Sequence, residues 1–311
     1  MEHVCQERAQ VTNAMLEQPC TAITIESKDI EARMKIEIRD IGIPPRPSIL
    51  GQIEKETLKD APDFVSLAKL IGSDVGLAAG LIKTANSPFF GFGKKVRTVQ
   101  EALLVLGLKL VVQTIAGLSL RQMFNHLPQM ERFWDTSANT ARVAGWLAKQ
   151  LKKDSKIRPE DAYTFALFRD CGIPVLIAPF PEYLSILTEA NAEKELSFTD
   201  IENRYMPLNH AVVGSELVES WLLPEDIIDA VRFHHDLSII SQQQQTQKIQ
   251  PQSLALIAIA QLAEYIVQKQ TQMAQNHEWE KLGTTSLSIL GLSEEQFETL
   301  LNDGLEFMSA E

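Results

Sequence analysis

Apolar residues recur at helical spacing through most of this chain, and residues that end helices interrupt the runs. Phe64, Leu67, Ala68 and Ile71 form one such stripe, which stops at Gly72. Residues three or four positions apart share one face of a helix, so this pattern predicts an amphipathic helix. No stretch shows the sustained period-two alternation between turns that is typical of strands. The sequence therefore predicts an all-α fold built of helices of ordinary length.

Residues that typically start helices support this prediction of separate helices. Thr98 and Glu101 have the spacing of a capping box and precede an apolar run that Gly107 is expected to stop. Pro159 and Pro224 are each followed by acidic residues, as is typical of the first turn of a helix. The Gln-rich stretch 241–251 carries no such signal, and we expect it to connect two helices.

Charge argues against nucleic acid as a general partner. The 311 residues include 29 basic and 41 acidic side chains, which gives a net charge of −12. Binding to a phosphate backbone depends on clustered Lys and Arg, because counterion release drives it. We therefore expect no nucleic-acid partner.

Cysteine usage and hydropathy predict a reduced, cytoplasmic protein. Cys5, Cys20 and Cys171 are far apart, and none has zinc-site spacing. The first residues lack the pattern of a signal peptide. Polar residues interrupt the two most apolar runs, Leu103–Leu120 and Leu254–Val267, before either reaches the roughly 20 apolar residues of a membrane span. We expect both to be core helices, with no membrane contact.

Several short motifs occur in one order along the chain. They are Ile43–Pro47 (IPPRP), Leu81–Gly91 (LIKTANSPFFG), Val99–Gly107 (VQEALLVLG), Phe133-Trp134, Phe165–Gly172 (FALFRDCG), His210–Gly214, Trp221–Pro224 and His234-His235. In this order they resemble the HDOD domain family, the HD-related output domain of bacterial signalling proteins. The resemblance covers about residues 40–265.

The resemblance implies a two-lobed helical fold whose C-terminal lobe is related to HD phosphohydrolases. We accordingly expect an N-terminal helical extension at 1–40, an HDOD domain at 41–269 and a C-terminal helical extension at 270–311. Within the domain, 41–128 would form the N-terminal lobe and 129–269 the HD-like lobe. The family also implies a regulatory role in bacteria.

An HD metal site uses an early His, a His-Asp doublet, a late Asp and sometimes further His residues, which together hold metal ions that activate water. The matching positions here are Thr136, Arg169, Asp170, Gln261 (with Glu264 three residues away), and the further histidines His210, His234 and His235. Thr is a poor metal ligand at neutral pH, and Arg has no acceptor atom. The resemblance thus implies a degenerate site without metal or other cofactor. The alternative is a residual site for an ion such as Mn or Fe.

Arg169 and Asp170 leave two interpretations open. The Arg169 guanidinium could act as a built-in cation beside Asp170 where relatives hold a metal, because a buried carboxylate needs a charge partner. Alternatively, Arg169 extends into solvent and Asp170 caps backbone amides near Gly172. In either case inherited helix packing is expected to keep Asp170, His210 and His234 close together.

The other candidate residues also have structural interpretations. His234 shares a face with Ile227 and Val231, which favours a hydrogen-bonded core histidine over a metal ligand. His235 lies one position further round the helix and is expected to be exposed, and His210 could help to cap a helix. Cys171, beside Gly172, is expected to be a buried small apolar residue rather than a nucleophile.

The aromatic turn after Asn86 is a candidate partner contact. Phe89, Phe90 and Phe92 could be exposed at a loop tip, where aromatic residues commonly anchor interfaces. The alternative is that these rings fill the seam between the two lobes.

These observations favour a non-catalytic regulatory output module that binds a signalling protein or a small ligand. The alternative is a metal-dependent phosphohydrolase acting on a nucleotide or cyclic dinucleotide. Metal content and phosphoester turnover distinguish the two.

Overall fold

The computed structural model describes residues 41–87, 89–90, 95–127, 130–151, 157–241, 249–272 and 276–309. Across these ranges the regular structure is helical, without a strand, so the predicted all-α class is confirmed. The predicted N-terminal extension, residues 1–40, and most of the Gln-rich connection lie outside the described ranges. The helices are α4 (Ser48–Thr57), α5 (Phe64–Gly72), α6 (Val75–Ala85), α7 (Val99–Met123), α8 (Met130–Gln150), α9 (Pro159–Phe168), α10 (Gly172–Ile177), α11 (Tyr183–Ala192), α12 (Phe198–Tyr205), α13 (His210–Ser220), α14 (Glu225–Phe233), α15 (Leu237–Ser241), α17 (Pro251–Thr271), α18 (Glu278–Leu290) and α19 (Glu294–Ser309).

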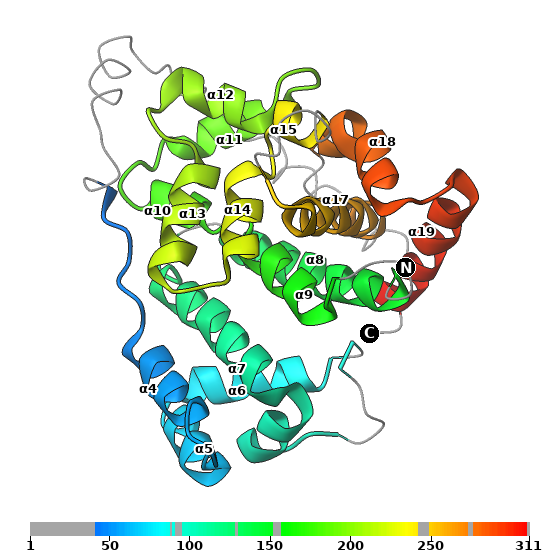
Figure 1. The fold of residues 1–311 in the computed structure, drawn as a ribbon. Coiled ribbons are helices and arrows are strands. Elements are labelled where there is room, and N and C mark those ends of the chain that lie inside the picture. The colour runs from blue at the N-terminus through cyan, green and yellow to red at the C-terminus, as the bar shows by residue number, and fades with distance from the viewer. Residues whose placement is uncertain are drawn as a thin grey trace, which may run out of the picture.

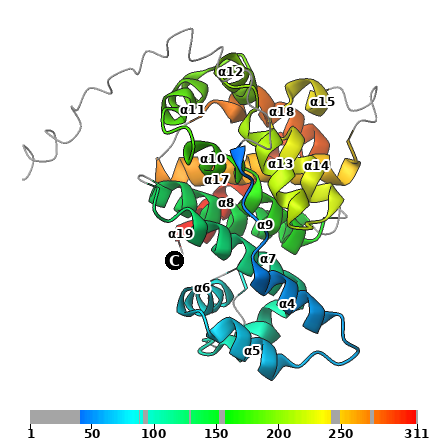
Figure 2. The ribbon, with the colours of Figure 1, turned by 90° about the vertical axis from the view of Figure 1, so that its left-hand side faces the viewer.

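Helices α4, α5 and α6 group at one end of the molecule, and α7 runs from this group towards the remaining helices (Figures 1 and 2). Asp63 and Asp74 cap α5 and α6 by accepting hydrogen bonds from backbone amides of the first turn. The apolar side of α5, including Leu67 and Ile71, is buried against this end of the fold. These three helices and α7 form the smaller lobe.

Helix α7 bends at Gly107, whose φ of 74° and ψ of 159° are not helical. Glycine adopts a positive φ without steric penalty, so the predicted stop at Gly107 becomes a bend between two helical halves. The capping box of Thr98 and Glu101 is present at the N-terminus of α7. By length and composition α7 alone among the described helices could cross a membrane. Because 61% of its apolar stretch is buried by neighbouring helices, core packing accounts for those residues.

The larger lobe is built around α8, α9 and α17, which pack on one another in its centre (Figure 1). Helices α10 to α14 cover one side of these three, and α13 packs against both α10 and α14. Helix α17 is buried along most of its length, which explains its apolar composition. This arrangement brings the C-terminal ends of α9 and α14 to the first turn of α13, and it places Glu264 of α17 beside the end of α9.

The C-terminal helices α18 and α19 pack directly on the larger lobe, against α17 and, for α19, also α8. Gly304 of α19 lies against Ile266 and Trp146, where an added Cβ would come within 2.8 Å of Ile266. Trp146 also stacks on Phe307 at 5.4 Å between ring centres. Residues 276–309 therefore belong to the packed body of this lobe.

A hydrogen bond and an aromatic pair are among the contacts that join the lobes. The indole Nε1 of Trp221, at the end of α13, donates a hydrogen bond to the backbone oxygen of Pro44 at 3.0 Å. Phe89 lies against Gly145 of α8 and stacks with Tyr163 of α9 at 6.3 Å. Both contacts tie residues of the N-terminal region to the larger lobe.

Candidate functional site

Arg169 follows the last turn of α9 and points into the protein. Its side chain is buried, with Nε 3.0 Å from Asp170 Oδ2. The two terminal nitrogens donate to both oxygens of Glu264 on α17, at 2.9 and 2.5 Å. The guanidinium therefore lies between two carboxylates as a built-in cation, and the interpretation in which Arg169 extends into solvent is wrong.

The charges of this group stabilise one another. Burial alone would lower the pKa of Arg169, but Asp170 and Glu264 outweigh that effect and raise the pKa above its usual value. Burial alone would raise the pKa of Asp170, but the Arg169 guanidinium outweighs it and holds that pKa well below its usual range. Arg169 and Asp170 are consequently both charged at neutral pH.

Glu264, and not Gln261, supplies the late acidic group. Both side chains are buried on α17, but the ion pair to Arg169 comes from Glu264. Asn276 also donates a hydrogen bond to Glu264 Oε1 at 3.1 Å. Thr136, the position matched to the early His, is half-buried on α8 and takes no part in the contacts described for this group.

His210 opens α13 and is fully buried beside Asp170. Its Nδ1 lies 2.7 Å from Glu202 Oε2, and its backbone amide donates to Glu202 Oε1 at 3.2 Å. The Tyr183 hydroxyl donates to the same carboxylate. Burial alone would lower the pKa of His210, but Glu202 and Asp170 outweigh it and raise that pKa to about 10. His210 is thus an imidazolium at neutral pH, in addition to its place in the first turn of α13.

Gly172 makes this position of His210 possible. A Cβ at residue 172 would lie 2.0 Å from the backbone oxygen of His210 and 2.7 Å from the amide nitrogen of Gly214. Only a residue without a Cβ lets α10 and α13 approach so closely. Cys171 is also buried here, with Sγ 3.6 Å from the Gly214 oxygen, and burial raises the pKa of its thiol, which suits a packing role.

His234 faces both Asp170 and His210. Its Nδ1 donates to the Val231 carbonyl at 2.8 Å, which leaves Nε2 as an acceptor. That Nε2 lies 3.3 Å from Asp170 Oδ1 and 3.3 Å from His210 Nε2. Burial and the neighbouring His235 lower the pKa of His234 to about 3, so it is neutral. Asp170 Oδ1 and His234 Nε2 are therefore two acceptors that face each other. The protonated Nε2 of His210 lies beside both of them.

His235 is buried, which corrects the expectation that it is exposed. Its Nδ1 lies 2.7 Å from Glu278 Oε2, and Lys281 pairs with the other oxygen of that carboxylate at 2.9 Å. Phe198 stacks on the imidazole at 4.9 Å between ring centres. Burial alone would raise the pKa of Glu278, but His235 and Lys281 outweigh it and lower that pKa to about 2.

Asp170, His210, His234 and His235 offer donor atoms that all lie within 4.8 Å of one another. We call these four residues the His-Asp cluster. Each histidine has its Nδ1 against a carboxylate or carbonyl, the usual orientation of a metal-ligating imidazole. The two closest Nε2 atoms are 3.3 Å apart, close to the roughly 3.4 Å between ligands of a tetrahedral ion bound at about 2.1 Å. This donor set fits one divalent ion, although Arg169 already neutralises Asp170.

The structure describes two rings of the aromatic turn, Phe89 and Phe90, and both pack in the seam between the lobes. Phe89 is buried and touches Gly145, which corrects its assignment as a partner contact. Phe90 is half-buried and packs edge-on against Tyr163 at 5.7 Å. Phe92 lies outside the described residues. The rings fill space between the lobes because Gly145 leaves room for Phe89.

The model of the HDOD domain family matches residues 43–237. An HDOD domain protein of Geobacter sulfurreducens has a similar fold, with a TM-score of 0.59 and 20% identity over 90% of this chain and 97% of that one. A protein of Shewanella amazonensis SB2B named "Putative metal-dependent phosphohydrolase" superposes with a TM-score of 0.63 and 15% identity, covering 91% of this chain and 99% of that one. These similarities show the fold.

Two further relatives extend the comparison. A protein of Marinobacter aquaeolei VT8 named "Putative signal transduction protein" gives a TM-score of 0.63 and 20% identity over 93% of this chain and 66% of that one. A curated protein of Treponema pallidum (strain Nichols) named "Uncharacterized protein" is 30% identical over 219 residues, or 69% of this chain. The matched region spans 42% of that relative's length.

Proposed function

We propose, from the premise that this chain belongs to the HDOD domain family, that it is a non-catalytic regulatory module of bacterial signal transduction. It acts by binding a protein or small ligand and by changing its affinity or shape in response. The fold is shared with a protein named for signal transduction, which supports this assignment. Its acidic charge of −12 favours protein or small-molecule partners over nucleic acid, and we expect it in the cytoplasm.

The observation that carries the proposal is the position of Arg169. Its guanidinium binds Asp170 Oδ2, at the Asp of the doublet, and both oxygens of Glu264, three residues from the position matched to the late Asp. Arg remains protonated and has no lone pair for a metal. The fixed positive charge also repels a second cation nearby. An HD-type site that needs these carboxylates for metal is therefore replaced by an ion pair.

The second candidate function is a metal-dependent phosphohydrolase acting on a nucleotide or cyclic dinucleotide. The specific observation in its favour is the His-Asp cluster, whose four donors suit one divalent ion such as Mn or Fe. A bound ion there would polarise a phosphoryl oxygen or lower the pKa of a water molecule. Asp170 and the three histidines would hold the ion, and Glu202 and Glu278 would orient two of those histidines.

A phosphoester assay tests the proposal. The purified chain is incubated with a generic phosphodiester, nucleoside triphosphates and cyclic dinucleotides in the presence of Mn²⁺, Mg²⁺ or Fe²⁺. We expect no metal-dependent turnover, with rates equal to those of the Asp170→Ala variant. Turnover that requires metal and disappears in Asp170→Ala would refute the proposal and establish the second function.

Binding of Mn²⁺ by variants tests whether Arg169 is what excludes a metal ion. Arg169→His restores the His-Asp doublet and removes the fixed cation beside Asp170. We expect this variant to bind Mn²⁺ more tightly than the parent chain in equilibrium dialysis. Arg158→His makes the same change in the ion pair of an exposed arginine with Asp161, at the other end of α9, and serves as the control. Equal Mn²⁺ binding by the parent and Arg169→His would show that the guanidinium is not what excludes the ion.

A further inference from the structure

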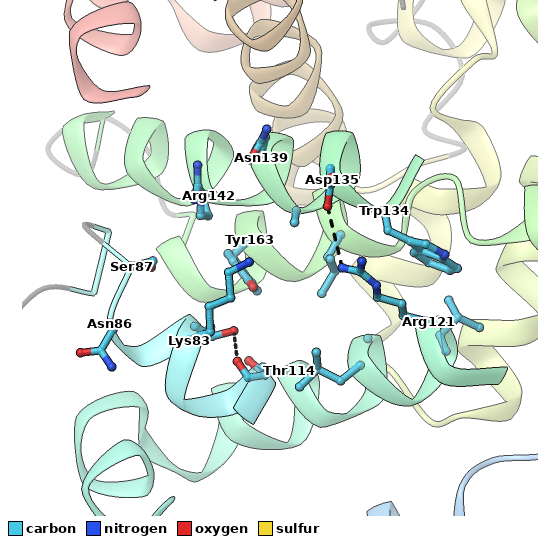
Figure 3. Close-up of a pocket in the computed structure, with 17 residues that line it drawn as sticks. Lys83, Asn86, Ser87, Thr114, Arg121, Trp134, Asp135, Asn139, Arg142 and Tyr163 are labelled. Atoms are coloured by element: carbon cyan, nitrogen blue, oxygen red, sulfur yellow. Dashed lines mark hydrogen bonds and ion pairs between the residues drawn. The ribbon is translucent and has the colours of Figure 1, made fainter. Parts of the chain in front are cut away.

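A cavity of about 800 Å³ opens between the two lobes, away from the His-Asp cluster. Its walls come from α6 and α7 on one side and from α8 and α9 on the other (Figure 3). Cavities of this size typically accept small organic ligands. A site shared by two lobes also suits a regulatory module, because a bound molecule contacts both of them.

Cationic side chains dominate the polar wall of this inter-lobe cavity. Lys83, Arg121 and Arg142 line it, whereas Asp135 is the one carboxylate among its lining residues. Arg121 lies 3.9 Å from Asp135, and Figure 3 shows this pair at one side. Lys83 extends from α6 towards the larger lobe and forms no ion pair with any described residue. A local excess of positive charge on a chain of net charge −12 favours an anionic ligand.

Three buried polar atoms in the same wall have no hydrogen-bond partner among the described residues. They are Ser87 Oγ, Thr114 Oγ1 and Trp134 Nε1, and all three residues are at least nine-tenths buried. A buried donor or acceptor without a partner costs about 1–3 kcal/mol, so such groups are rare in folded proteins. Each of the three atoms exposes less than 1 Å² in the ligand-free cavity, so a ligand would reach these groups only after their side chains rotate.

The rest of the wall is apolar and aromatic. Leu118, Leu167 and Tyr163 contribute to it, together with the ring of Trp134. A ligand that combines an anionic group with a flat apolar body would match the cationic side chains and the apolar surface of this cavity at once. We propose that the inter-lobe cavity is a binding site for a nucleoside phosphate, with its phosphate towards Lys83 and its base against the apolar wall.

Helix α9 links this site to the His-Asp cluster. Tyr163 and Leu167, one helical turn apart, line the cavity, and Arg169 and Asp170 follow directly at the end of the same helix. Leu167 also packs closely on Gly117 of α7, where an added Cβ would lie 2.6 Å away. A nucleotide in the cavity thereby acts on the helix that carries the Arg169 ion pairs. The inference rests on the proposed function in that it names the small ligand a non-catalytic module would sense.

Isothermal titration calorimetry on the full chain, without added metal, tests the site. The probes are AMP, ADP, GMP and GDP, with adenosine, guanosine and inorganic pyrophosphate as fragments that lack one part of the ligand. We expect at least one nucleotide to bind with a Kd below about 1 mM, and its nucleoside and pyrophosphate to bind about tenfold more weakly or worse. Absence of binding by all four nucleotides overturns the proposal, as does pyrophosphate binding that equals nucleotide binding.

Matched variants place the ligand. Lys83→Glu reverses the free charge in the last turn of α6, and we expect it to weaken nucleotide binding about tenfold or more. Lys69→Glu makes the same change in the last turn of α5, outside the cavity, and should leave the Kd within about twofold. Thr114→Val removes an unpartnered hydroxyl at constant shape and should also weaken binding. Binding unaffected by both Lys83→Glu and Thr114→Val overturns the assignment to this cavity.

The calorimetric test of this cavity and the phosphoester test of the proposed function can fail independently. Metal-dependent turnover that requires Asp170 would refute the non-catalytic role and leave the calorimetric result at Lys83 intact. Failure of every nucleotide to bind would refute the cavity assignment and leave the phosphoester assay unchanged.

Discussion

The His-Asp cluster and the inter-lobe cavity lie along the same helix, α9, but they treat polar groups in opposite ways. Around the cluster, buried ionisable side chains are paired: Arg169 with Asp170 and Glu264, His210 with Glu202, and His235 with Glu278. In the cavity wall, Lys83 has no ion pair with a described residue, and three buried polar atoms lack hydrogen-bond partners. The polar groups of the cluster are satisfied within the protein, whereas the cavity wall keeps an unpaired Lys83 and three unpartnered polar atoms among the described residues.

This difference between paired and unpaired polar groups indicates where a ligand could gain binding energy. A group that already has its partners gains little from a ligand, because any new contact must replace an existing one. Unpartnered groups in a cavity gain their full interaction on binding, so sites are commonly built at the expense of stability. We therefore expect substitutions near the cluster to change the stability of the fold, and substitutions in the cavity to change binding.

The largest effect is expected for Gly172→Ala, which attacks the packing beneath the cluster. The added Cβ would meet the backbone of His210 at 2.0 Å, and backbone cannot move aside cheaply. We expect a loss of more than ~4 kcal/mol in the free energy of unfolding, measured by urea denaturation. Gly72→Ala, at the end of α5 with no atom within 4 Å of the added Cβ, is the control and should cost under ~1 kcal/mol. A loss of similar size in both variants would contradict the close approach of α10 and α13.

The next effect is expected for Glu264→Gln, which keeps the shape of the side chain but removes a charge from Arg169. The buried guanidinium would retain only Asp170 as a charged partner, and we expect a loss of about 3 kcal/mol. Glu216→Gln breaks a partly exposed pair with Arg232 and should cost less than about 1 kcal/mol. Equal losses, again in urea, would show that the Arg169 network is no more important than a surface ion pair.

A smaller effect on stability is expected to distinguish the buried indoles of Trp221 and Trp134. Trp221→Phe removes a hydrogen bond to Pro44, whereas Trp134→Phe removes an Nε1 that has no partner among the described residues. We expect the first variant to lose about 1 kcal/mol more stability than the second, because both lose similar ring volume. Thermal unfolding followed by circular dichroism measures the difference. A larger loss in Trp134→Phe would mean that its Nε1 is satisfied after all.

The smallest effect is expected for Thr114→Val in the absence of ligand. Its hydroxyl has no partner among the described residues, so an apolar group of the same shape should leave the free energy of unfolding unchanged or raise it by up to about 1 kcal/mol. Thr164→Val is the matched control, since the Thr164 hydroxyl donates to the Glu160 carbonyl at 2.7 Å and its loss should cost about 1 kcal/mol. Thr114→Val destabilising more than Thr164→Val would contradict the comparison between cluster and cavity.

Much of the fold follows from local chemistry in the sequence. Apolar spacing predicts the helix at 64–72, and the capping box at Thr98 and Glu101 marks the start of α7. The family resemblance also predicts that Asp170, His210 and His234 lie together, and the structure brings them within 3.6 Å of Asp170 Oδ1. These features depend on neighbours in sequence or on a pattern shared with relatives.

The parts of the site that the sequence does not predict depend on tertiary packing. Glu202 and Glu278 resemble solvated acids on amphipathic helices, and only the packing of α12 against α13 and of α18 against α15 and α17 buries them beside histidines. Gln261 and Glu264 are almost one helical turn apart, so spacing alone does not choose between them, whereas the reach of Arg169 does. The cavity combines residues of four helices, and no short motif marks such a combination.

The hydrogen bond from Trp221 to Pro44 bears on how the chain acquires its structure. It joins groups 177 residues apart, between the entrance to the smaller lobe and the end of α13. Contacts between such distant residues cannot form until the long intervening segment is ordered, because closing a long loop costs entropy. The lobe interface should therefore assemble late in folding, after each lobe has collapsed locally. A fragment that begins after residue 47 would lack the Pro44 acceptor. We expect its larger lobe to refold, with the end of α13 still accessible to proteases.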